Sequence, residues 1–228
     1  LDTTEPRRIR LVHVSPDTDP LDPYVVYGLG DGFSRVRMTG DLRYGGATPY
    51  GEVPLRMVII EAYAVGADPD LVEPMNSQAV YLYEDAPSTT AFAAGLSASP
   101  NEEDELRLFS LADAFDTPDA GETLAWVVHT VPNLETLAID FGDDGSFEAL
   151  LVRFGANEGE PLVLDADTDL TMVVRDATST AIIDVFTTPS MGSDRKNFLV
   201  LTGIKDGSPG FSLLLVDQDG SQGFTAPN

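Results

Sequence analysis

The chain of 228 residues contains no cysteine. Disulfide bonds, thiol nucleophiles, iron–sulfur clusters and zinc–thiolate sites are therefore excluded. Histidine is nearly as scarce, because His13 and His129 are the only two in the chain. No apolar run approaches the roughly 18 residues of a membrane-spanning helix, and residues 1–8 lack the apolar segment of a signal peptide. We therefore predict that this chain contains neither a transmembrane segment nor a signal segment.

Basic residues are also few. The chain has 13 Lys and Arg against 38 Asp and Glu, a formal net charge of −25. Both halves share the excess, since residues 1–116 carry 20 acids and 8 bases and residues 117–228 carry 18 acids and 5 bases. A field of this sign repels phosphate backbones and anionic lipid surfaces. We therefore expect no nucleic-acid partner. The excess of acidic residues is then explained by binding of divalent cations, by cationic partners or by solubility in a salty medium.

One pattern stands out because it occurs twice. Leu11–Pro16 and Val127–Pro132 are both apolar runs in which histidine is followed three residues later by proline. Further landmarks follow each copy in the same order: Tyr44-Gly45 then Val53–Leu55 in the first, and Phe154-Gly155 then Pro161–Val163 in the second. Repetition at this spacing indicates two similar domains in tandem. We place them at residues 1–116 and 117–228.

The apolar segments are short, rich in Val, Ile, Tyr, Phe and Thr, and separated by Gly, Pro, Asp and Asn. This pattern is typical of strands, and it predicts an all-β protein with an immunoglobulin-like antiparallel β-sandwich in each half. The predicted strands are 9–14, 24–27, 34–38, 55–65, 79–83, 89–96 and 105–111, then 124–130, 137–141, 147–152, 162–164, 170–175, 181–186, 198–202 and 211–216. We expect Ser221–Asn228 to be a frayed tail and Asn101–Asp104 a solvated loop.

The segments Arg10–Asp17, Tyr24–Gly28 and Tyr44–Pro54 together resemble the bacterial domain of unknown function 4397. The resemblance implies an all-β protein, often in tandem copies, that is secreted, periplasmic or attached to the cell surface. It implies no known activity and carries over no catalytic residue. The second half keeps His129 and Pro132 of the motif and departs from it at three positions: Trp126 for the arginine, Val131 for the serine and Asn133 for the aspartate.

The repeated motif is interpreted as structural. Ser15 or Asp17 can accept backbone N–H bonds in the turn that follows His13, and Pro16 fixes φ there. Arg10 lies three residues before His13 and therefore on the opposite face of a regular strand. The alternative is a metal or proton-transfer histidine. A metal site needs several ligands, and the only other histidine, His129 of the second motif with Pro132, belongs to the other domain. A metal centre shared by the two histidines is therefore not expected.

Aspartate-rich strings offer calcium candidates. Alternating carboxylates in a loop can converge on one cation. The better candidates are Asp165, Asp167 and Asp169, and Asp217 with Asp219; Asp140–Gly145 is a third string. None completes an EF-hand, since Leu170 stands where that pattern needs glycine. Solvated turns are the competing interpretation.

No catalytic constellation is present: the sequence lacks a Gly-x-Ser-x-Gly elbow, a phosphate loop and a dinucleotide-binding glycine turn. We therefore expect a protein without enzymatic activity that holds a protein or polysaccharide partner outside the cell. Two alternatives remain, a calcium-stabilised extracellular spacer and a glycan-acting hydrolase that uses paired carboxylates. Tyr81 and Tyr83 share one strand face and belong either to the core or to an exposed aromatic platform for carbohydrate, whereas Trp126 is expected in the core.

Overall fold

The computed structural model describes residues 6–29, 32–54, 56–82 and 86–228. Tyr83 and the predicted turn residues Gly30 and Asp31 lie outside these ranges. The elements are almost all strands, as predicted, and the one helix of the described residues is a single 3₁₀ turn, η1, at Glu102–Asp104. None of the described helices has the length and apolarity to cross a membrane.

Contacts divide the chain into two units. The first unit comprises Leu1–Ala98 and Leu106–Ala114, and the second comprises Ser99–Glu105 and Phe115–Asn228. The short acidic segment Ser99–Glu105 thus packs with the second unit although it precedes the last strand of the first. Each unit is described separately below.

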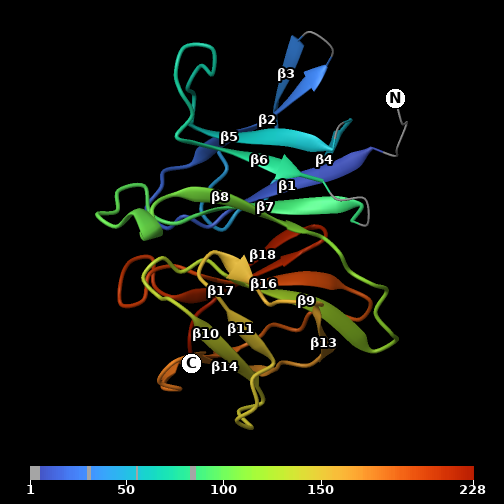
Figure 1. The fold of residues 1–228 in the computed structure, drawn as a ribbon. Coiled ribbons are helices and arrows are strands. Elements are labelled where there is room, and N and C mark those ends of the chain that lie inside the picture. Colours follow the sequence, from blue (N-terminus) through green and yellow to red (C-terminus); the bar gives the residue numbers. More distant parts are fainter. Residues whose placement is uncertain (1–5, 30–31, 55, 83–85) are drawn as a thin grey trace. The chain divides into compact units, whose positions relative to one another are not determined.

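The first unit is a sandwich of two four-stranded sheets (Figure 1). Its strands are β1 (Arg7–His13), β2 (Leu21–Leu29), β3 (Gly32–Arg37), β4 (Gly51–Val53), β5 (Met57–Ala64), β6 (Asn76–Tyr81), β7 (Ser88–Ala94) and β8 (Arg107–Ala112). One sheet has the order β4-β1-β7-β8 and the other β3-β2-β5-β6. Buried side chains from both sheets, such as Leu11, Val25, Ile60 and Ala91, form one core between them.

The second unit repeats this plan with two additional strands. Its strands are β9 (Glu122–His129), β10 (Leu137–Phe141), β11 (Ala149–Leu151), β12 (Gly155–Ala156), β13 (Leu162–Asp165), β14 (Thr171–Asp176), β15 (Ile182–Thr187), β16 (Lys196–Thr202), β17 (Ser212–Asp217) and β18 (Gly220–Thr225). The sheets run β12-β9-β16-β17-β18, with β13 also paired to β9, and β11-β10-β14-β15. Val127, Ile139, Val174 and Leu199 belong to the core between them.

The order of the strands is the same in the two units once β12 and β18 are set aside, because β13 pairs with β9 at the positions where β4 pairs with β1. In each unit the first strand pairs in parallel with a late strand, β1 with β7 and β9 with β16, while the other ladders are antiparallel. The beginning and the end of each unit thus lie side by side in one sheet. This arrangement explains why the histidine motif, at the end of the first strand, reaches the loop that follows the late strand.

Two expectations about solvated segments were wrong. Residues 221–228 do not fray as a whole, because β18 pairs with β17 and the Asn228 N–H donates to the Val185 carbonyl at 2.8 Å. This strand was not predicted because it consists mainly of glycine and polar residues. Its backbone is ordered by pairing with β17 at the edge of the sheet. The acidic loop is not fully solvated either: Asp104 is buried and forms an ion pair with Arg153.

Candidate functional site

His13 closes the first strand of the first unit. Its imidazole is fully buried, and its Nδ1 accepts the backbone N–H of Ser15 at 3.4 Å. Burial lowers the pKa of His13 to about 4, although the backbone carbonyls of Asp19 and Thr18 act in the opposite direction. The ring is therefore neutral near pH 7 and has no access to solvent.

His129 occupies the same place in the second unit. Its Nδ1 accepts the N–H of Val131 at 3.3 Å, and its Nε2 faces the carbonyl oxygens of Leu134 at 3.2 Å and Glu135 at 3.0 Å. An Nδ1 that accepts a bond leaves Nε2 to donate, so the imidazole is neutral. Burial lowers the pKa of His129 to about 4. Each histidine thus accepts the backbone N–H two residues ahead. The Nε2 of His129 also contacts the carbonyls five and six residues ahead, whereas the buried Nε2 of His13 has no hydrogen-bond partner among the described residues.

The residue four positions after each histidine attaches the turn to a second loop. In the first unit, Asp17 Oδ1 accepts the N–H of Ser97 at 2.8 Å. In the second, Asn133 Nδ2 donates to the carbonyl of Lys205 at 2.8 Å, and its Oδ1 accepts the Lys205 N–H at 3.0 Å. Aspartate and asparagine differ in charge but share the acceptor that this bond needs.

The other motif residues also make local contacts. The Ser15 hydroxyl donates to the Gly95 carbonyl at 2.7 Å and contacts the Thr18 hydroxyl. Pro16 and Pro132 each lie in the turn that follows the histidine strand. These positions contact backbone and core, and no partner molecule is needed to account for them.

Arg10 lies on the face of β1 opposite to His13 and belongs to a buried polar network. Its guanidinium stacks over the Tyr50 ring at 4.5 Å, and its Nε donates to Thr90 Oγ1 at 3.0 Å. The Tyr50 hydroxyl donates to Asp113 Oδ2 at 2.5 Å. Burial raises the pKa of Asp113, while the Tyr50 hydroxyl and the Arg10 charge act to lower it. The network places the buried Arg10 charge next to a carboxyl group.

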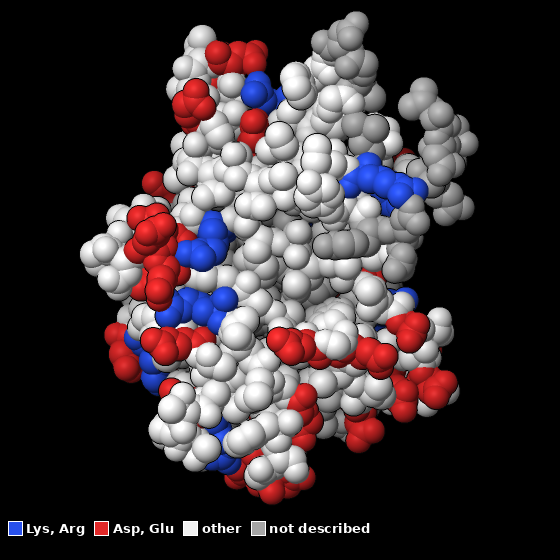
Figure 2. Space-filling model, in the orientation of Figure 1, with Lys and Arg blue, Asp and Glu red and all other residues white. Residues whose placement is uncertain are grey.

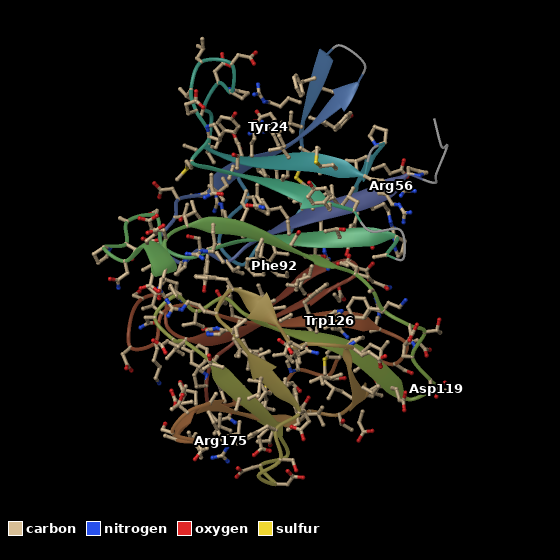
Figure 3. The ribbon with its side chains drawn as sticks, in the orientation of Figure 1. Tyr24, Arg56, Phe92, Asp119, Trp126 and Arg175 are labelled. Carbon is tan, nitrogen blue, oxygen red and sulfur yellow. The ribbon has the colours of Figure 1, made fainter. Side chains whose placement is uncertain are left out.

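The second unit has an aromatic cluster where the first has this network. Trp126 stands three residues before His129 and lies opposite Phe198, just as Arg10 lies opposite Thr90. Phe115 packs edge-on against both rings, 6.4 Å from Trp126 and 5.6 Å from Phe198 between centroids (Figure 3 labels Trp126). Trp126 is half-buried, so it belongs to this cluster on the sheet face and not to the core between the sheets.

The landmarks Tyr44-Gly45 and Phe154-Gly155 are equivalent in the structure only when one of them is shifted by one residue relative to the predicted match. Gly45 and Phe154, not Tyr44 and Phe154, occupy equivalent positions. Their N–H groups donate to the carbonyls of His13 at 2.7 Å and His129 at 2.8 Å. Both have left-handed backbones, with φ of 79° at Gly45 and 58° at Phe154. The sequence comparison aligned the two aromatic residues, Tyr44 and Phe154. The structure instead aligns the two residues that have the left-handed backbone, Gly45 and Phe154.

The calcium candidates are engaged in turns and ion pairs or lie in solvent. Asp217 Oδ1 accepts the N–H groups of Asp219 and Gly220 at 2.8 and 3.0 Å, and the Asp219 carboxylate pairs with Arg195 at 2.7 Å. The exposed carboxylates of Asp165, Asp167 and Asp169 lie at the end of β13 and just beyond it. Within the described ranges, no group of three or more His, Cys, Asp or Glu side chains is placed to hold a metal ion.

A different region carries exposed functional side chains. We call it the outer face: the side of the β3-β2-β5-β6 sheet that points away from the core of the first unit. Register places Phe33 opposite Gly28, Arg35 opposite Val26, and Tyr24 opposite Glu61. Because alternate residues share a face, these side chains project together. The sequence reveals none of this, since the register of three strands is needed to bring them side by side.

A hollow of about 260 Å³ lies on the outer face, beneath the segment that joins β5 to β6. We call that segment the covering loop, residues 65–75. Arg35 Nε contacts Glu61 Oε2 at 2.9 Å, and Arg35 Nη1 contacts Asp70 Oδ1 of the covering loop at 2.9 Å. The Tyr63 hydroxyl donates to the same Glu61 oxygen at 2.9 Å. Arg35 thus connects the sheet to the loop, and Figure 2 shows acidic side chains gathered on this loop at the upper left.

Asp22 anchors the base of the covering loop. Its Oδ2 accepts the Gly66 N–H at 2.8 Å, and its Oδ1 contacts Arg37 at 2.5 Å and accepts the Asp41 N–H at 3.0 Å. Burial acts to raise the pKa of Asp22, but the bonds from Arg37, Gly66 and Asp41 outweigh it and lower the pKa. The carboxylate is held as an anion that fixes the loop to the sheet.

Apolar side chains of the outer face and of the covering loop remain in solvent. Phe33 is 84% exposed, and Met57 and Tyr81, which lie opposite each other on β5 and β6, are 51% and 62% exposed. In the covering loop, Leu71 is 81% exposed. Single exposed apolar residues are ordinary, but several on one sheet face indicate an interaction surface. Tyr81 therefore lies on the exposed face and outside the core, while Tyr24, labelled in Figure 3, packs edge-on against Tyr63 at 5.5 Å.

Comparisons with known proteins leave the family open. No family model matches the sequence, and no curated protein matches it. A solved pair of C2 domains from extended synaptotagmin 2 aligns over 92% of this chain and 83% of that chain, with 14% identity and a TM-score of 0.25. An adhesin candidate from Bacteroides ovatus aligns over 100% of this chain and 97% of that chain, with 9% identity and a TM-score of 0.22. At these TM-scores neither similarity carries an argument about this chain.

The resemblance to the domain of unknown function 4397 therefore stays a prediction. The outer face was missed because its members are far apart in sequence, Arg35 and Glu61 being 26 residues apart. One signal was present: 65–75 is a long Pro- and Asp-rich stretch between two predicted strands, and its counterpart in the second half, 177–181, is short. Extended loops of that kind often carry function.

Proposed function

We propose that this chain is a non-catalytic surface-interaction protein that is exported and holds its partner through the outer face of the first unit. Export is supported by the resemblance of Arg10–Asp17 and Tyr44–Pro54 to the domain of unknown function 4397. The net charge of −25 supports a protein or polysaccharide partner over a nucleic acid.

We further propose that the two units arose by duplication of one sandwich. The shared strand order supports this, and so do the two histidines with the same backbone partners at the same offsets. Duplication leaves one copy able to diverge while the other preserves the architecture. On this proposal, the first unit diverged at its outer face and thereby gained a binding role.

Binding, and not catalysis, is favoured by where the reactive groups lie. His13 and His129 are fully buried, and Asp113 is almost fully buried beside Tyr50. Acid–base chemistry needs a group within hydrogen-bonding reach of the substrate. The exposed side chains of the outer face are instead Phe33, an arginine held by two carboxylates, and apolar groups, which suit recognition.

The single observation that carries the proposal is the combination of a polar hollow with a fully projecting aromatic ring on the same sheet face. Ligand sites are concave and combine apolar walls with a few fixed polar groups. Arg35, Glu61 and Tyr63 are fixed by their mutual bonds, and Phe33 lies two residues from Arg35 on β3.

The test is binding of the fluorescently labelled protein to isolated cell envelopes of the organism that encodes it. Phe33→Ala should weaken binding about tenfold, since truncating a central aromatic side chain costs about 1–2 kcal/mol or more. The matched control is Leu150→Ala, because Leu150 is 59% exposed on β11, the strand that corresponds to β3 in the second unit. Equal binding by the two variants, or no binding by the wild type, would contradict the proposal.

A further inference from the structure

We infer that the hollow beneath the covering loop binds one ring of an uncharged polysaccharide, with Phe33 stacking on a neighbouring ring. This inference rests on the proposed function and names the ligand class for the same face. It follows from the hydrogen-bonding groups of the hollow, the exposed Phe33 ring beside it, and the size and charge of the hollow.

The floor of the hollow offers donors and acceptors side by side. Arg35 carries a planar guanidinium with five N–H donors, and Glu61 and Asp70 supply carboxylate oxygens on either side of it. A hydroxyl group both accepts and donates, so adjacent hydroxyls of a sugar ring can accept from Arg35 and donate to a carboxylate. The groups are already positioned by their mutual bonds, which reduces the entropic cost of binding.

The aromatic ring beside the hollow belongs to Phe33, two residues from Arg35 on β3. Phe33 lies opposite Gly28, and a Cβ at residue 28 would be 3.9 Å from the Phe33 ring. The ring therefore leans over a position with no side chain, and 84% of Phe33 remains exposed. A flat, exposed ring suits the C–H face of a sugar, which is apolar and also flat. Phe33 and Arg35 share one side of β3, so stacking and hydrogen bonding act on neighbouring rings of one chain.

Size and charge narrow the ligand further. At about 260 Å³ the hollow is smaller than the roughly 300–1,000 Å³ of sites that enclose drug-sized molecules, and it fits a single ring. Its walls carry one arginine against three acids, Glu61, Asp70 and Glu73. An anionic sugar would meet repulsion from these acids and from the net charge of the chain. The hollow therefore suits an uncharged glycan over an anionic one.

The test uses the same envelope fraction after two treatments. Periodate cleaves the vicinal diols of sugars, and protease removes proteins. We expect periodate to reduce binding of the wild-type protein about tenfold or more, as removal of several hydrogen bonds predicts, and protease to leave binding unchanged. Binding should change less than about twofold between about 0.05 M and about 0.5 M salt, because an uncharged ligand is insensitive to screening.

Variants connect the ligand to the hollow. Arg35→Ala should weaken envelope binding about tenfold, the cost of removing hydrogen bonds from a charged donor. Arg195→Ala should leave binding unchanged, because Arg195 forms a comparable exposed ion pair with Asp219 in the second unit. Thermal melting of both variants shows that each is folded, and Arg35→Lys, which keeps the charge and a point donor, should restore part of the binding.

The outcomes separate this inference from the proposed function. Binding that protease abolishes and periodate spares means a protein partner, which overturns the glycan but keeps the surface-interaction role. Steep loss of binding with salt overturns the uncharged ligand. Equal binding by the Arg35→Ala and Arg195→Ala variants overturns the hollow as the site. No binding to any envelope preparation overturns both proposals.

Discussion

The two units differ most in how their second sheet is connected. In the first unit, residues 65–75 join β5 to β6 and cover a hollow. In the second, the equivalent strands β14 and β15 are joined by 177–181, a tight turn in which Asp176 Oδ1 accepts the N–H groups of Thr178 and Ser179. The strand order is unchanged. A sandwich therefore accepts an added loop at this connection, and the added loop brings the groups that its shorter counterpart lacks.

A second contrast lies around the residue three positions before each histidine. Arg10, Tyr50 and Asp113 form a buried polar network in the first unit, whereas Trp126 and Phe198 form an aromatic cluster in the second. The strand ladders on both sides are the same. The backbone plan thus accommodates opposite chemistry on one sheet face.

The largest effect is expected from exchanging the connection. Replacing residues 65–75 with 177–181 removes the wall of the hollow and should abolish envelope binding. Stability should fall by about 1–3 kcal/mol, since the exchange disrupts the bonds from the Gly66 N–H to Asp22 and from the Met75 N–H to the Ala62 carbonyl, and removes the Arg35–Asp70 ion pair. Binding assays and urea unfolding measure the two effects. Retained binding would show that the covering loop is not part of the site.

The histidines provide a comparison in which the units should behave alike. His13→Ala and His129→Ala should each lower the free energy of unfolding by about 3 kcal/mol, because each leaves backbone groups unsatisfied and opens a cavity. Both side chains are fully buried, so neither defect can be repaired by solvent. Denaturant unfolding of each variant measures the change. A decrease below about 1 kcal/mol in one variant alone would show that the repeated motif serves different roles in the two units.

Much of the architecture follows from sequence, but the binding face does not. Alternating apolar residues such as Ile9 and Leu11 predict strands, and the repeated His-x-x-Pro motif predicts two similar halves. The strand β18 was missed because Gly220–Thr225 has little apolar content and gains its order from pairing with β17. The hollow was missed because only strand register brings Arg35 and Glu61 together, and no local pattern encodes register between distant strands.

Acid should destabilise both units through their histidines. Burial lowers the pKa of His13 and of His129 to about 4, against an ordinary value of 6.5. The unfolded chain therefore binds protons at a higher pH than the native one, so this stability is complete above pH 6.5 and is lost as the pH falls toward 4. Each histidine contributes up to roughly 3 kcal/mol over that range.

The measurement is urea unfolding from pH 7 to pH 4.5 on the wild type and on His129→Gln. Carboxylates also titrate in this range, so the difference between the two proteins isolates His129. The variant should show a shallower decrease of stability with acid. Parallel curves for the two proteins would mean that His129 does not contribute the expected dependence.

The polar network and the aromatic cluster should each lose a modest and similar amount of stability when one member is changed conservatively. Tyr50→Phe removes the hydroxyl that donates to Asp113 and should cost about 1 kcal/mol, because the buried carboxyl group is left with fewer partners. Trp126→Phe keeps an aromatic ring and should cost about the same through its smaller packed area. Thermal melts of both variants test this. A neutral Tyr50→Phe would indicate that the network carries little net stability.

The smallest effect is expected at the calcium candidates. Asp219→Asn breaks an exposed ion pair with Arg195 and should change the free energy of unfolding by less than about 1 kcal/mol. Adding calcium or chelator should leave the melting temperature of the wild type unchanged, because Asp217 already accepts two backbone N–H groups. A rise of several degrees with calcium would favour a metal-stabilised spacer.

Hydrogen–deuterium exchange on the intact protein locates the binding face most directly. With a solubilised envelope fraction added, backbone amides of β3 and β5 and of the covering loop should exchange more slowly, and those of β10, β11 and β14 should not change. Protection confined to the second unit, or absent from β3 and the loop while binding is saturated, would contradict the assignment of the site to the first unit.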